Sequence, residues 1–320
     1  MKSLFGRRSA IVTAALATAL VLSGCSSSVN DSAGEASGDC GSYAIAMHAW
    51  GGYTASAQVI AEVAKQELGC TITQTTLEEG PVTYDAMEAG TIDVVIEDWG
   101  GGRWKDWTDR GAVVEAGENG NIGIIGMYVA PWMVEKYPDI TDSKNLNKYA
   151  ALFKTADSGG KGAWFEGPTG YTTIGEKMVS ANKLNFKVIF SGSEAALVDG
   201  FIKAEANKTP FIGYAWQPWT LHSKLPTLEA ARVVFPANDW SDPAAASGLT
   251  DYPSTPLKKL MSKKLNDAND PFTALVKNFS WTNADQNGVA ADLEGGMTAE
   301  EAAKKWIAAN AATVASWLGK

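Results

Sequence analysis

The amino-acid sequence predicts an α/β protein with parallel β-sheet, built from two successive series of alternating strands and helices. Three observations support this prediction. Residues 42–96 show the order β-α-β-α-β, which is typical of parallel sheets with right-handed crossovers. Residues 163–216 repeat the alternation. In both series a buried strand ends at a tryptophan, at the edge of the sheet where ligands of α/β proteins bind.

Residues 1–24 have the pattern of a secretory signal, so we do not expect them to belong to the fold. Three basic residues precede an apolar stretch at 10–22 that is short for a membrane span. Residues 22–25 resemble the lipobox of bacterial lipoproteins, which implies cleavage before Cys25 and lipid attachment to that residue. The alternative is an ordinary signal with a chance cysteine. Residues 25–39 are mostly small and polar, and we expect a lipidated flexible tether that anchors the protein without spanning the membrane.

The charge of the mature chain argues against nucleic acid as a partner. Of the 27 lysines and arginines, three lie in the signal, which leaves 24 against 36 acidic residues. No basic patch is interleaved with aromatic residues, as it would be on a nucleic-acid-binding surface. The body from residue 40 to 320 is long enough to form two lobes.

Two cysteines remain in the body, and each stands at the start of a predicted strand. Cys40 precedes the strand at 42–48, and Cys70 precedes the strand at 71–77. In a βαβ unit such strands are parallel and often adjacent, which brings their starts to the same edge of the sheet. Outside the cytoplasm this arrangement favours a disulfide bond. The alternative is a pair of inert buried thiols.

The predicted strand at 92–96 leads to the first candidate ligand-binding residues. β-branched residues in a short run, followed by glycines, predict a central parallel strand that ends in a functional loop. Three glycines follow Trp99 and leave its ring little local cover. Glu97 lies two residues earlier and points to the same side, so it either faces a cation or pairs with a nearby lysine or arginine. Trp50 and Tyr53 follow the first strand and offer a second ligand edge.

The remaining elements follow from hydrophobic periodicity and helix-capping signals. Residues 298–318 open with a capping box and predict one helix, with Trp306 and Trp317 as packing residues and Asn310 as a small polar break on the same flank. The predicted strands are 42–48, 71–77, 92–96, an apolar segment at 121–128, 163–166, 187–190 and 210–216. The predicted helices are 55–68, one around 84–88, one that contains Trp132, 145–150, 174–182, 193–204 and 298–318.

The second series offers an aromatic residue at a strand end, as the first does. Trp216 ends the strand at 210–216 in the way that Trp99 follows its own strand. The loop at 167–173 presents backbone N–H groups before a helix, which is a ready site for an anion, and Tyr171 adds a ring. Aromatic faces attract cations, and cages of them suit quaternary ammonium groups. A cage beside an anion site predicts a zwitterionic ligand such as a betaine.

Four segments, taken together in their order and spacing, show a family resemblance. They are 86–93 leading to Trp99, 170–173, 214–219 and 295–318. Over nearly the whole body the chain resembles the glycine betaine/proline betaine substrate-binding proteins of ABC importers, the ProX/OpuAC family. The resemblance implies the α/β type II periplasmic-binding-protein fold, with a ligand cleft between two βα lobes. Lobe 1 would comprise 40–125 plus 256–320, and lobe 2 would comprise 126–255.

The same resemblance assigns roles to individual residues. In that family three aromatic side chains box the trimethylammonium group, which implies a box of Trp99, Tyr171 and Trp216. Backbone amides hold the carboxylate, which implies those of Thr172 and Thr173. Where the family often has tryptophan, this chain has Tyr171. The other candidate ligand-binding residues are Trp50, Tyr53 and Glu97.

The function implied is that of a substrate-binding protein and not of an enzyme. It would sit, lipid-anchored and monomeric, on the outer face of the cytoplasmic membrane and close by a hinge on a quaternary ammonium solute used in osmoprotection. Its partners would be a cognate permease and ATPase, with no cofactor or metal.

Three other functions are weighed against this one. A binding protein for choline, carnitine or another cationic small molecule is the nearest alternative, because such ligands suit the same cage. An extracellular hydrolase has less support, since His48 and His222 are the only histidines and no G-x-S-x-G, H-E-x-x-H or Cys/His metal pattern appears in a suitable context. We expect His48 to be a hydrogen-bonded structural residue and His222 to lie on the surface. A purely structural lipoprotein would not explain aromatic residues at two strand ends.

Overall fold

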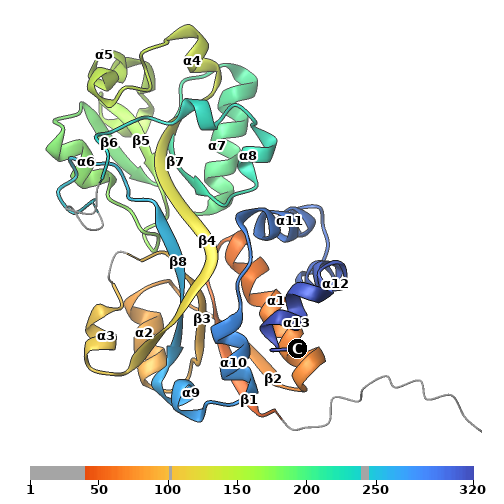
Figure 1. Ribbon diagram of the computed structural model, residues 1–320. Coiled ribbons are helices and arrows are strands. Elements are labelled where there is room, and N and C mark those ends of the chain that lie inside the picture. Colours follow the sequence, from red (N-terminus) through yellow and green to blue (C-terminus); the bar gives the residue numbers. More distant parts are fainter. Residues whose placement is uncertain (1–39, 101–102, 239–244) are drawn as a thin grey trace, which may run out of the picture. The chain divides into compact units, whose positions relative to one another are not determined.

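The structure confirms the α/β class, with strands and helices alternating along the chain. The computed structural model describes residues 40–320 except 101–102 and 239–244, and the described strands form one eight-stranded sheet. The strands are β1 Ser42–Met47, β2 Thr71–Thr76, β3 Val94–Asp98, β4 Val113–Val129, β5 Gly162–Glu166, β6 Phe186–Phe190, β7 Ile212–Gln217 and β8 Thr255–Ser262. Their order across the sheet is β2-β1-β3-β8-β4-β7-β5-β6 (Figure 1).

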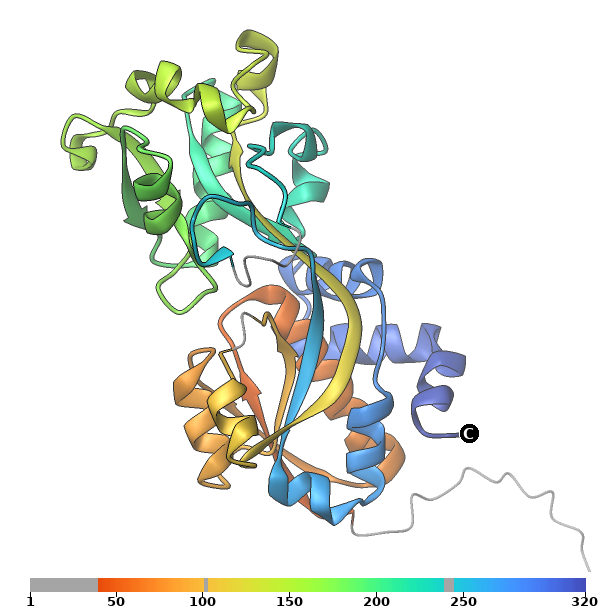
Figure 2. The ribbon, with the colours of Figure 1, turned by 60° about the vertical axis from the view of Figure 1, so that its left-hand side comes forward.

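Two parallel sections of the sheet are joined by two antiparallel strands. β1 pairs in parallel with β2 and β3, and β5 pairs in parallel with β6 and β7, as two βα series require. β4 pairs antiparallel with β7 and β8, and β8 pairs antiparallel with β3. Figures 1 and 2 show β4 and β8 passing from one section to the other. We call the part built on β1, β2 and β3 half 1, and the part built on β5, β6 and β7 half 2.

The sequence analysis identified only part of β4 and did not identify β8. β4 spans 17 residues, whereas only 121–128 reads as an apolar strand in the sequence. The pairing of β4 with β8 shifts register in two places, and Gly117 and Gly120 take positive φ angles of 89° and 91° in this region. Such bulges interrupt the alternation of side chains by which a strand is recognised.

Helices cover the sheet of half 1 from both sides. Figure 1 shows α1 and the C-terminal helices on one side and α2 and α3 on the other. The helices of half 1 are α1 Gly51–Leu68, α2 Pro81–Glu88, α3 Lys105–Asp109, α9 Lys263–Ala268, α10 Pro271–Asn278, α11 Asn283–Glu294, α12 Ala299–Ala309 and α13 Ala311–Trp317. Those of half 2 are α4 Trp132–Lys136, α5 Leu146–Tyr149, α6 Gly175–Ala181, α7 Glu194–Asn207 and α8 Leu221–Lys224. Among the described residues, half 2 also contains 3₁₀ turns at Ser143–Asn145, Ala150–Phe153, Ala156–Ser158 and Glu229–Ala231.

The longest helix, α1, begins at Gly51, earlier than the predicted start at residue 55. Its N-cap residue, Trp50, makes no side-chain capping bond, and its first turn holds no acidic residue. The helix ends at Gly69, which adopts the left-handed conformation that favours glycine (φ 71°). The N–H groups at the N-terminus of α1 therefore need a hydrogen-bond acceptor from elsewhere in the chain. This N-terminus lies directly beside Trp50.

The C-terminal segment forms two helices and not the single helix predicted for 298–318. α12 and α13 are separated at Asn310, whose φ and ψ of −125° and 36° lie outside the helical region. The Asn310 side chain donates to the carbonyl oxygen of Trp306. Asn310 therefore ends α12, whereas the sequence predicted only a polar residue on the side of one continuous helix. Trp306 and Trp317 are buried and stacked on each other with ring centroids 5.5 Å apart, which agrees with their predicted packing role.

The two cysteines of the body form a disulfide bond. β1 and β2 are adjacent and parallel, with Ser42 opposite Thr71, so the residues that precede these strands start side by side. The Cα atoms of Cys40 and Cys70 are 4.6 Å apart. The bond ties the start of β1 to the edge strand of half 1.

One lysine is buried in the middle of the sheet without a carboxylate partner in the described part of the chain. The Nζ atom of Lys259, on β8, donates to the carbonyl oxygens of Lys277 and Phe279 at 2.8 and 2.5 Å. These carbonyls lie at the C-terminal end of α10, where a helix favours a cation. Burial lowers the pKa of Lys259 to about 8.

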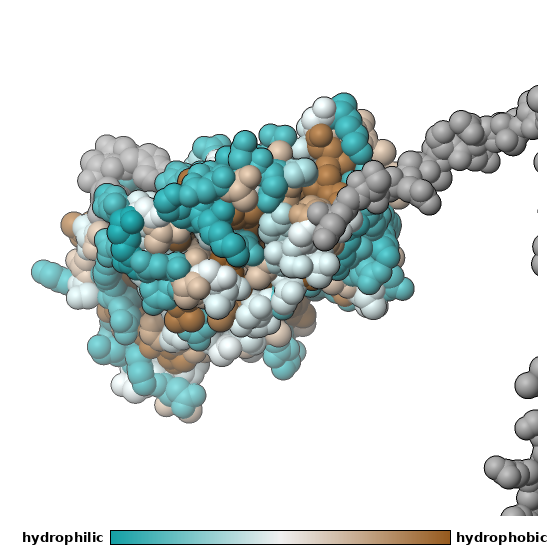
Figure 3. All heavy atoms as spheres, turned by 90° about the horizontal axis from the view of Figure 1, so that it is seen from below, coloured by the Kyte–Doolittle hydropathy of each residue, from teal (hydrophilic) through white to brown (hydrophobic). Residues whose placement is uncertain are grey.

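No helix in residues 40–320, outside the two undescribed gaps, combines the length and the apolarity of a membrane span. The predicted signal and Cys25 lie outside the described residues. On the face shown in Figure 3, hydrophilic residues cover most of the surface, and hydrophobic residues form separate patches.

Candidate functional site

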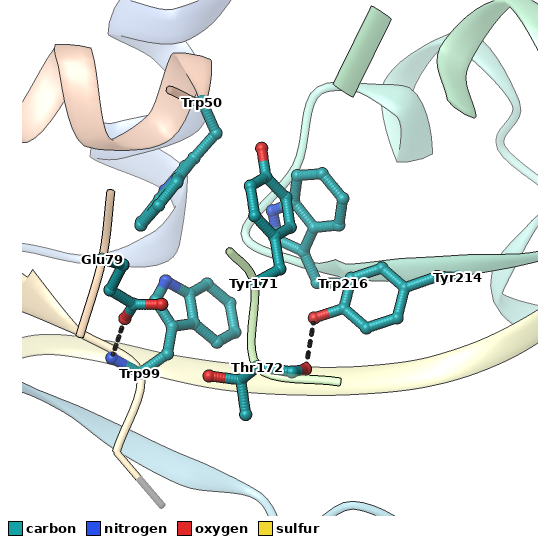
Figure 4. A pocket seen from close by; sticks show the side chains of 7 residues that line it. All are labelled: Trp50, Glu79, Trp99, Tyr171, Thr172, Tyr214 and Trp216. Atoms are coloured by element: carbon teal, nitrogen blue, oxygen red, sulfur yellow. Dashed lines mark hydrogen bonds between the residues drawn. The ribbon is translucent and has the colours of Figure 1, made fainter. Parts of the chain in front are cut away.

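One cavity lies where the two halves meet, and we call it the central cavity. It encloses about 260 Å³ when the space open to solvent is included. Five of its seven lining side chains are aromatic. The lining residues are Trp50, Glu79, Trp99, Tyr171, Thr172, Tyr214 and Trp216 (Figure 4).

The lining residues come from the carboxyl ends of the parallel strands, where ligands of α/β proteins bind. Half 1 contributes Trp50 before α1, Glu79 after β2 and Trp99 directly after β3. Half 2 contributes the loop between β5 and α6 and the last residues of β7. Figure 4 shows Trp50 and Trp99 on one side of the cavity and the aromatic residues of half 2 on the other. The structure thus brings together Trp50, Trp99, Tyr171, Thr172 and Trp216 from the predicted set.

Tyr171 stands at the centre of the ring arrangement. Its ring centroid is 5.4 Å from that of Trp50 and 5.7 Å from that of Trp216, and both contacts are edge-on. Its hydroxyl group donates to the carbonyl oxygen of Ala49 at 3.1 Å, which links half 2 to half 1. Behind Trp216, the ring of Trp219 stacks at 4.0 Å and supports it from outside the cavity.

Glu97 lies behind the tryptophans and does not line the cavity. It is fully buried. Its Oε1 atom accepts the indole N–H groups of Trp50 and Trp99 at 3.0 and 2.9 Å, and its Oε2 atom accepts the hydroxyl group of Ser56 at 2.9 Å. Glu97 was expected either to face the ligand or to pair with a basic residue, and it does neither in this structure. Sequence spacing gave the correct side of the strand, but the indoles occupy the space between this carboxylate and the cavity.

Tyr53 is also placed away from the cavity. It is fully buried, and its phenol oxygen accepts the backbone N–H of Ile96 at 3.2 Å. As a residue of the first turn of α1 it points into half 1, because the helix begins earlier than predicted. Its ring packs edge-on against that of Trp50 at 5.3 Å, so it supports one wall instead of forming another.

Two lining residues, Glu79 and Tyr214, were missed by the sequence analysis. Glu79 accepts the backbone N–H of Trp99 at 3.1 Å and pairs with Nη2 of Arg103 at 2.5 Å. The signal for Glu79 was its place just after β2, at the same sheet edge as Trp99. The signal for Tyr214 was its spacing of two from Trp216 on one strand, which puts both rings on the same face.

The loop between β5 and α6 carries the polar side of the cavity. The Tyr214 hydroxyl donates to the carbonyl oxygen of Thr172 at 3.0 Å (Figure 4). The backbone N–H groups of Tyr171 and Ile174 donate to Pro168 and to the Tyr252 hydroxyl. Within the described residues, the amide N–H groups of Thr172 and Thr173 meet no acceptor, and the buried Thr172 Oγ1 has no hydrogen-bond partner. These groups can serve an anionic or polar part of a ligand.

A buried acid holds this loop at its base. Glu166 accepts the backbone N–H of Gly167 at 3.1 Å and the indole N–H of Trp164 at 3.3 Å. Burial raises the pKa of Glu166 to about 7. The carboxylate thereby anchors the start of the loop that presents Tyr171 and Thr172.

Neither histidine lines the cavity. His48 is buried, and its Nδ1 atom lies 3.0 Å from the carbonyl oxygen of Leu77, which agrees with a structural role. His222 was expected on the surface but is partly buried, with Nε2 2.9 Å from the carbonyl oxygen of Trp216. Burial lowers the pKa of both imidazoles. No cluster of metal-ligating side chains occurs among the residues described.

Glu194 connects the two halves next to the cavity. Located at the start of α7 in half 2, it accepts the backbone N–H of Gly51 at 2.9 Å and the indole N–H of Trp219 at 2.6 Å. Gly51 is the first residue of α1 in half 1 and follows the cavity residue Trp50. Glu194 thus provides the acceptor that the N-terminus of α1 lacks in its own half.

Known proteins resemble this chain along most of its length. The family model described as the substrate binding domain of the ABC-type glycine betaine transport system matches residues 41–309. A trimethylamine N-oxide-binding protein of Pelagibacter ubique is 28% identical over 285 residues, which covers 83% of this chain and 87% of that protein. A glycine betaine/carnitine transport binding protein of Listeria monocytogenes is 28% identical over 127 residues, or 40% of this chain and 38% of that protein.

Two solved structures share the fold. Lactococcal OpuAC, closed and complexed with glycine betaine, has a TM-score of 0.67 and 20% identity, and the match covers 87% of this chain and 99% of that one. An ABC-transporter choline binding protein in complex with choline has a TM-score of 0.71 and 18% identity, with coverage of 88% and 92%. The fold is therefore that of the periplasmic binding proteins. The chain belongs to the family of substrate-binding domains of ABC-type glycine betaine transport systems, whose members are extracytoplasmic binding proteins that deliver small ligands to a permease and are not enzymes.

Proposed function

We propose that this protein captures glycine betaine, or a similar quaternary ammonium zwitterion, in an aromatic cage at the central cavity. The observation that carries the proposal is the set of five aromatic side chains, contributed by both halves, around one small cavity. A trimethylammonium group cannot donate ordinary hydrogen bonds, and its charge is attracted by ring faces. Trp50, Trp99, Tyr171 and Trp216 form the cage, with Tyr214 beside them.

The carboxylate of such a ligand would be held by the loop between β5 and α6. The amide N–H groups of Thr172 and Thr173 and the Thr172 hydroxyl are donors in that loop without an acceptor among the described residues. Glu79 is the one acid on the cavity wall, and it is already paired with Arg103. This pairing supports a zwitterion over a plain cation, because the wall then brings no uncompensated negative charge of its own.

The alternative ligand is a cation without a carboxylate, such as choline, or carnitine with its longer chain. The Glu79 carboxylate on the cavity wall is the observation that favours it. Trimethylamine N-oxide, for which the Pelagibacter relative is named, carries the same methylated nitrogen with an oxygen in place of the carboxylate. These compounds therefore belong in one ligand panel.

Binding is proposed to close the two halves around the ligand by a hinge. Each half alone offers only part of the cage, so a bound ligand bridges them and favours the closed form. The Tyr171–Ala49 and Glu194–Gly51 hydrogen bonds are cross-half contacts that would stabilise that form. The moving parts are proposed as lobe 1, residues 40–125 plus 256–320, and lobe 2, residues 126–255.

The protein is further proposed to be a lipid-anchored monomer that serves a separate permease and ATPase and supplies a compatible solute for osmoprotection. The lipobox-like segment before Cys25 supports the anchor. Cys25→Ser should release the protein in soluble form or leave an unprocessed precursor. Lipid labelling that persists in this variant would contradict the anchor.

Calorimetric titration of the mature protein tests the ligand and the cage together. Glycine betaine should bind at least tenfold more tightly than 3,3-dimethylbutanoate, which has the same shape and carboxylate but a neutral tert-butyl head. Choline and trimethylamine N-oxide complete the panel. Tighter binding of choline than of glycine betaine would favour the alternative ligand, and no binding of any trimethylated compound would contradict the proposal.

Variants at Trp216 then test whether this side chain is a wall of the proposed cage. Trp216→Ala should weaken binding by roughly tenfold or more, because each desolvated ring contact is worth about 1–2 kcal/mol, and Trp216→Phe should lose less because it keeps a ring face. Trp306→Ala is the control, since this ring is buried far from the cavity among the C-terminal helices. It should lower the melting temperature and leave Kd nearly unchanged.

A further inference from the structure

Glu97 is a buried acid for which the described residues offer no basic partner. It is fully buried directly behind the cavity wall. Its hydrogen-bond partners are two indoles and one hydroxyl, and none of the ion pairs in the described structure includes it. A buried carboxylate costs free energy unless its charge is compensated. Either protonation of the acid or a cation near the cavity offsets this cost.

The hydrogen bonds of Glu97 define the orientation of two cage walls. One oxygen atom, Oε1, receives the N–H groups of both Trp50 and Trp99, at 3.0 and 2.9 Å. Each indole is held by its polar edge, so its ring can no longer turn freely about the side chain. The two rings lie together on one side of the cavity (Figure 4). Removing this acceptor would leave two buried donors unpaired.

We propose that Glu97 is a positioning residue that also selects a positively charged ligand head, acting through the indoles of Trp50 and Trp99 without touching the ligand. The inference rests on the proposed aromatic cage and deepens it. The bound cation would lie across the indoles from the carboxylate and offset its charge in a site with little water. A negative acceptor at an indole N–H also polarises the ring and makes its face more attractive to a cation.

The ionisation of Glu97 is accordingly linked to the charge of the ligand. Burial raises the pKa of Glu97, whereas the hydrogen bonds from Trp50, Trp99 and Ser56 lower it. A cation enclosed by the same two indoles adds to the influences that favour the carboxylate. A ligand of the same shape with a neutral head adds no such influence, so its binding does not gain from Glu97.

Glu97→Gln is the matched substitution for this test. The glutamine oxygen can still accept both indole N–H groups, and its amide group can donate to the Ser56 hydroxyl, which already lies within reach of the Gly52 carbonyl oxygen at 3.1 Å. Calorimetry compares glycine betaine with 3,3-dimethylbutanoate in both proteins. Glu97→Gln should weaken the binding of glycine betaine, which has a cationic head, by about tenfold. It should change the binding of 3,3-dimethylbutanoate, whose head is neutral, by less than about twofold.

Glu115→Gln is the control, because it makes the same substitution at an indole acceptor away from the cavity. Glu115 accepts the N–H of Trp104 at 2.9 Å, and neither residue lines the central cavity. Both ligands should bind this variant as they bind the wild type.

Two results would overturn the inference while leaving the cage intact. Unchanged affinity of Glu97→Gln for glycine betaine would remove the charge role, and an equal loss for both ligands would reduce Glu97 to a structural support. If wild-type protein binds no trimethylated compound, the proposed function itself fails. Should Glu97→Gln fail to fold, ¹³C NMR of the Glu97 carboxyl carbon in the wild-type complex with glycine betaine decides the matter. An ionised carboxylate is expected, and a protonated acid would overturn the inference.

Discussion

Replacing Glu194 by glutamine should weaken ligand binding without removing any group from the central cavity. The Glu194 carboxylate accepts two hydrogen bonds, from Gly51 of half 1 and from Trp219 of half 2. Glutamine has a single oxygen and can accept only one of them. Because the bond to Gly51 crosses between the halves, the proposed hinge opening would break it and would leave the bond to Trp219, within half 2, intact.

The size of the expected rise in Kd follows from the loss of the hydrogen bond to Gly51 alone. A hydrogen bond to a charged acceptor contributes about 1.5–3 kcal/mol net. Here the acceptor also faces the N-terminus of α1, an 18-residue helix with no other acid in its first turn, which favours a negative charge. Since Glu194 is only partly buried, we take the lower end, about 1.5 kcal/mol. That shifts the balance between closed and open forms by about tenfold, and Kd rises by up to the same factor.

Three measurements separate closure from other causes. Calorimetry should show the rise in Kd, and stopped-flow tryptophan fluorescence should place most of it in a faster koff. Solution scattering should show that the ligand reduces the radius of gyration of the wild type, with a higher ligand concentration needed to produce the same reduction in Glu194→Gln.

The chain offers a matched control on the same helix. Glu205 accepts the backbone N–H of Trp132, the first residue of α4, at 2.8 Å, within half 2. Glu205→Gln likewise removes the negative charge of an acceptor at a helix start, so it should lower stability without changing Kd. If Glu194→Gln is folded and binds with the wild-type Kd, the cross-half contact does not contribute to closure.

Two further predictions concern stability. The pKa of Lys259, about 8 in the folded protein, lies below the value of about 10.4 in an unfolded chain, so the unfolded chain holds one more proton between these pH values. The contribution of Lys259 to the free energy of unfolding should therefore rise from pH 8 towards pH 10, by up to about 1.4 kcal/mol per pH unit, and urea titrations should show this slope in the wild type but not in Lys259→Met. Removing the disulfide with Cys40→Ser and Cys70→Ser frees a loop with a sequence separation of 30, and the double variant should lose roughly 3–4 kcal/mol in a denaturant titration while its folded fraction keeps the wild-type Kd.

Local patterns in the sequence were sufficient to predict the class of fold and two of the strand ends at which the cavity lies. A short β-branched run followed by glycines predicted β3 as a central strand with a loop at its carboxyl end, and this rests on side-chain periodicity and turn chemistry alone. The parallel pairing of β1 with β2 follows from the βα alternation and places Cys40 beside Cys70. Trp99 and Trp216 could be named as candidate wall residues because each occurs where its strand ends.

Interruptions of those local patterns hid other elements. β4 carries bulges at glycines with positive φ, so its first part shows no alternation, and β8 joins the sheet antiparallel. The helix break at Asn310 depends on a side-chain bond to Trp306 that competes with the next helical turn. A helical period continues through this residue in the sequence, and so it predicted one helix.

The sequence by itself determined which residues stand where the strands end, and the tertiary structure decided which residues line the cavity. Glu97 and Trp99 share one side of a strand by period two, yet the carboxylate lies behind the ring because Trp50, from a distant segment, donates to the same oxygen. Contacts between distant segments also hold Glu79 and Tyr214 at the cavity wall. Glu79 pairs with Arg103, and the Tyr214 hydroxyl donates to the carbonyl oxygen of Thr172. Such choices depend on hydrogen bonds and packing between segments far apart in the chain, and no local pattern of residues contains them.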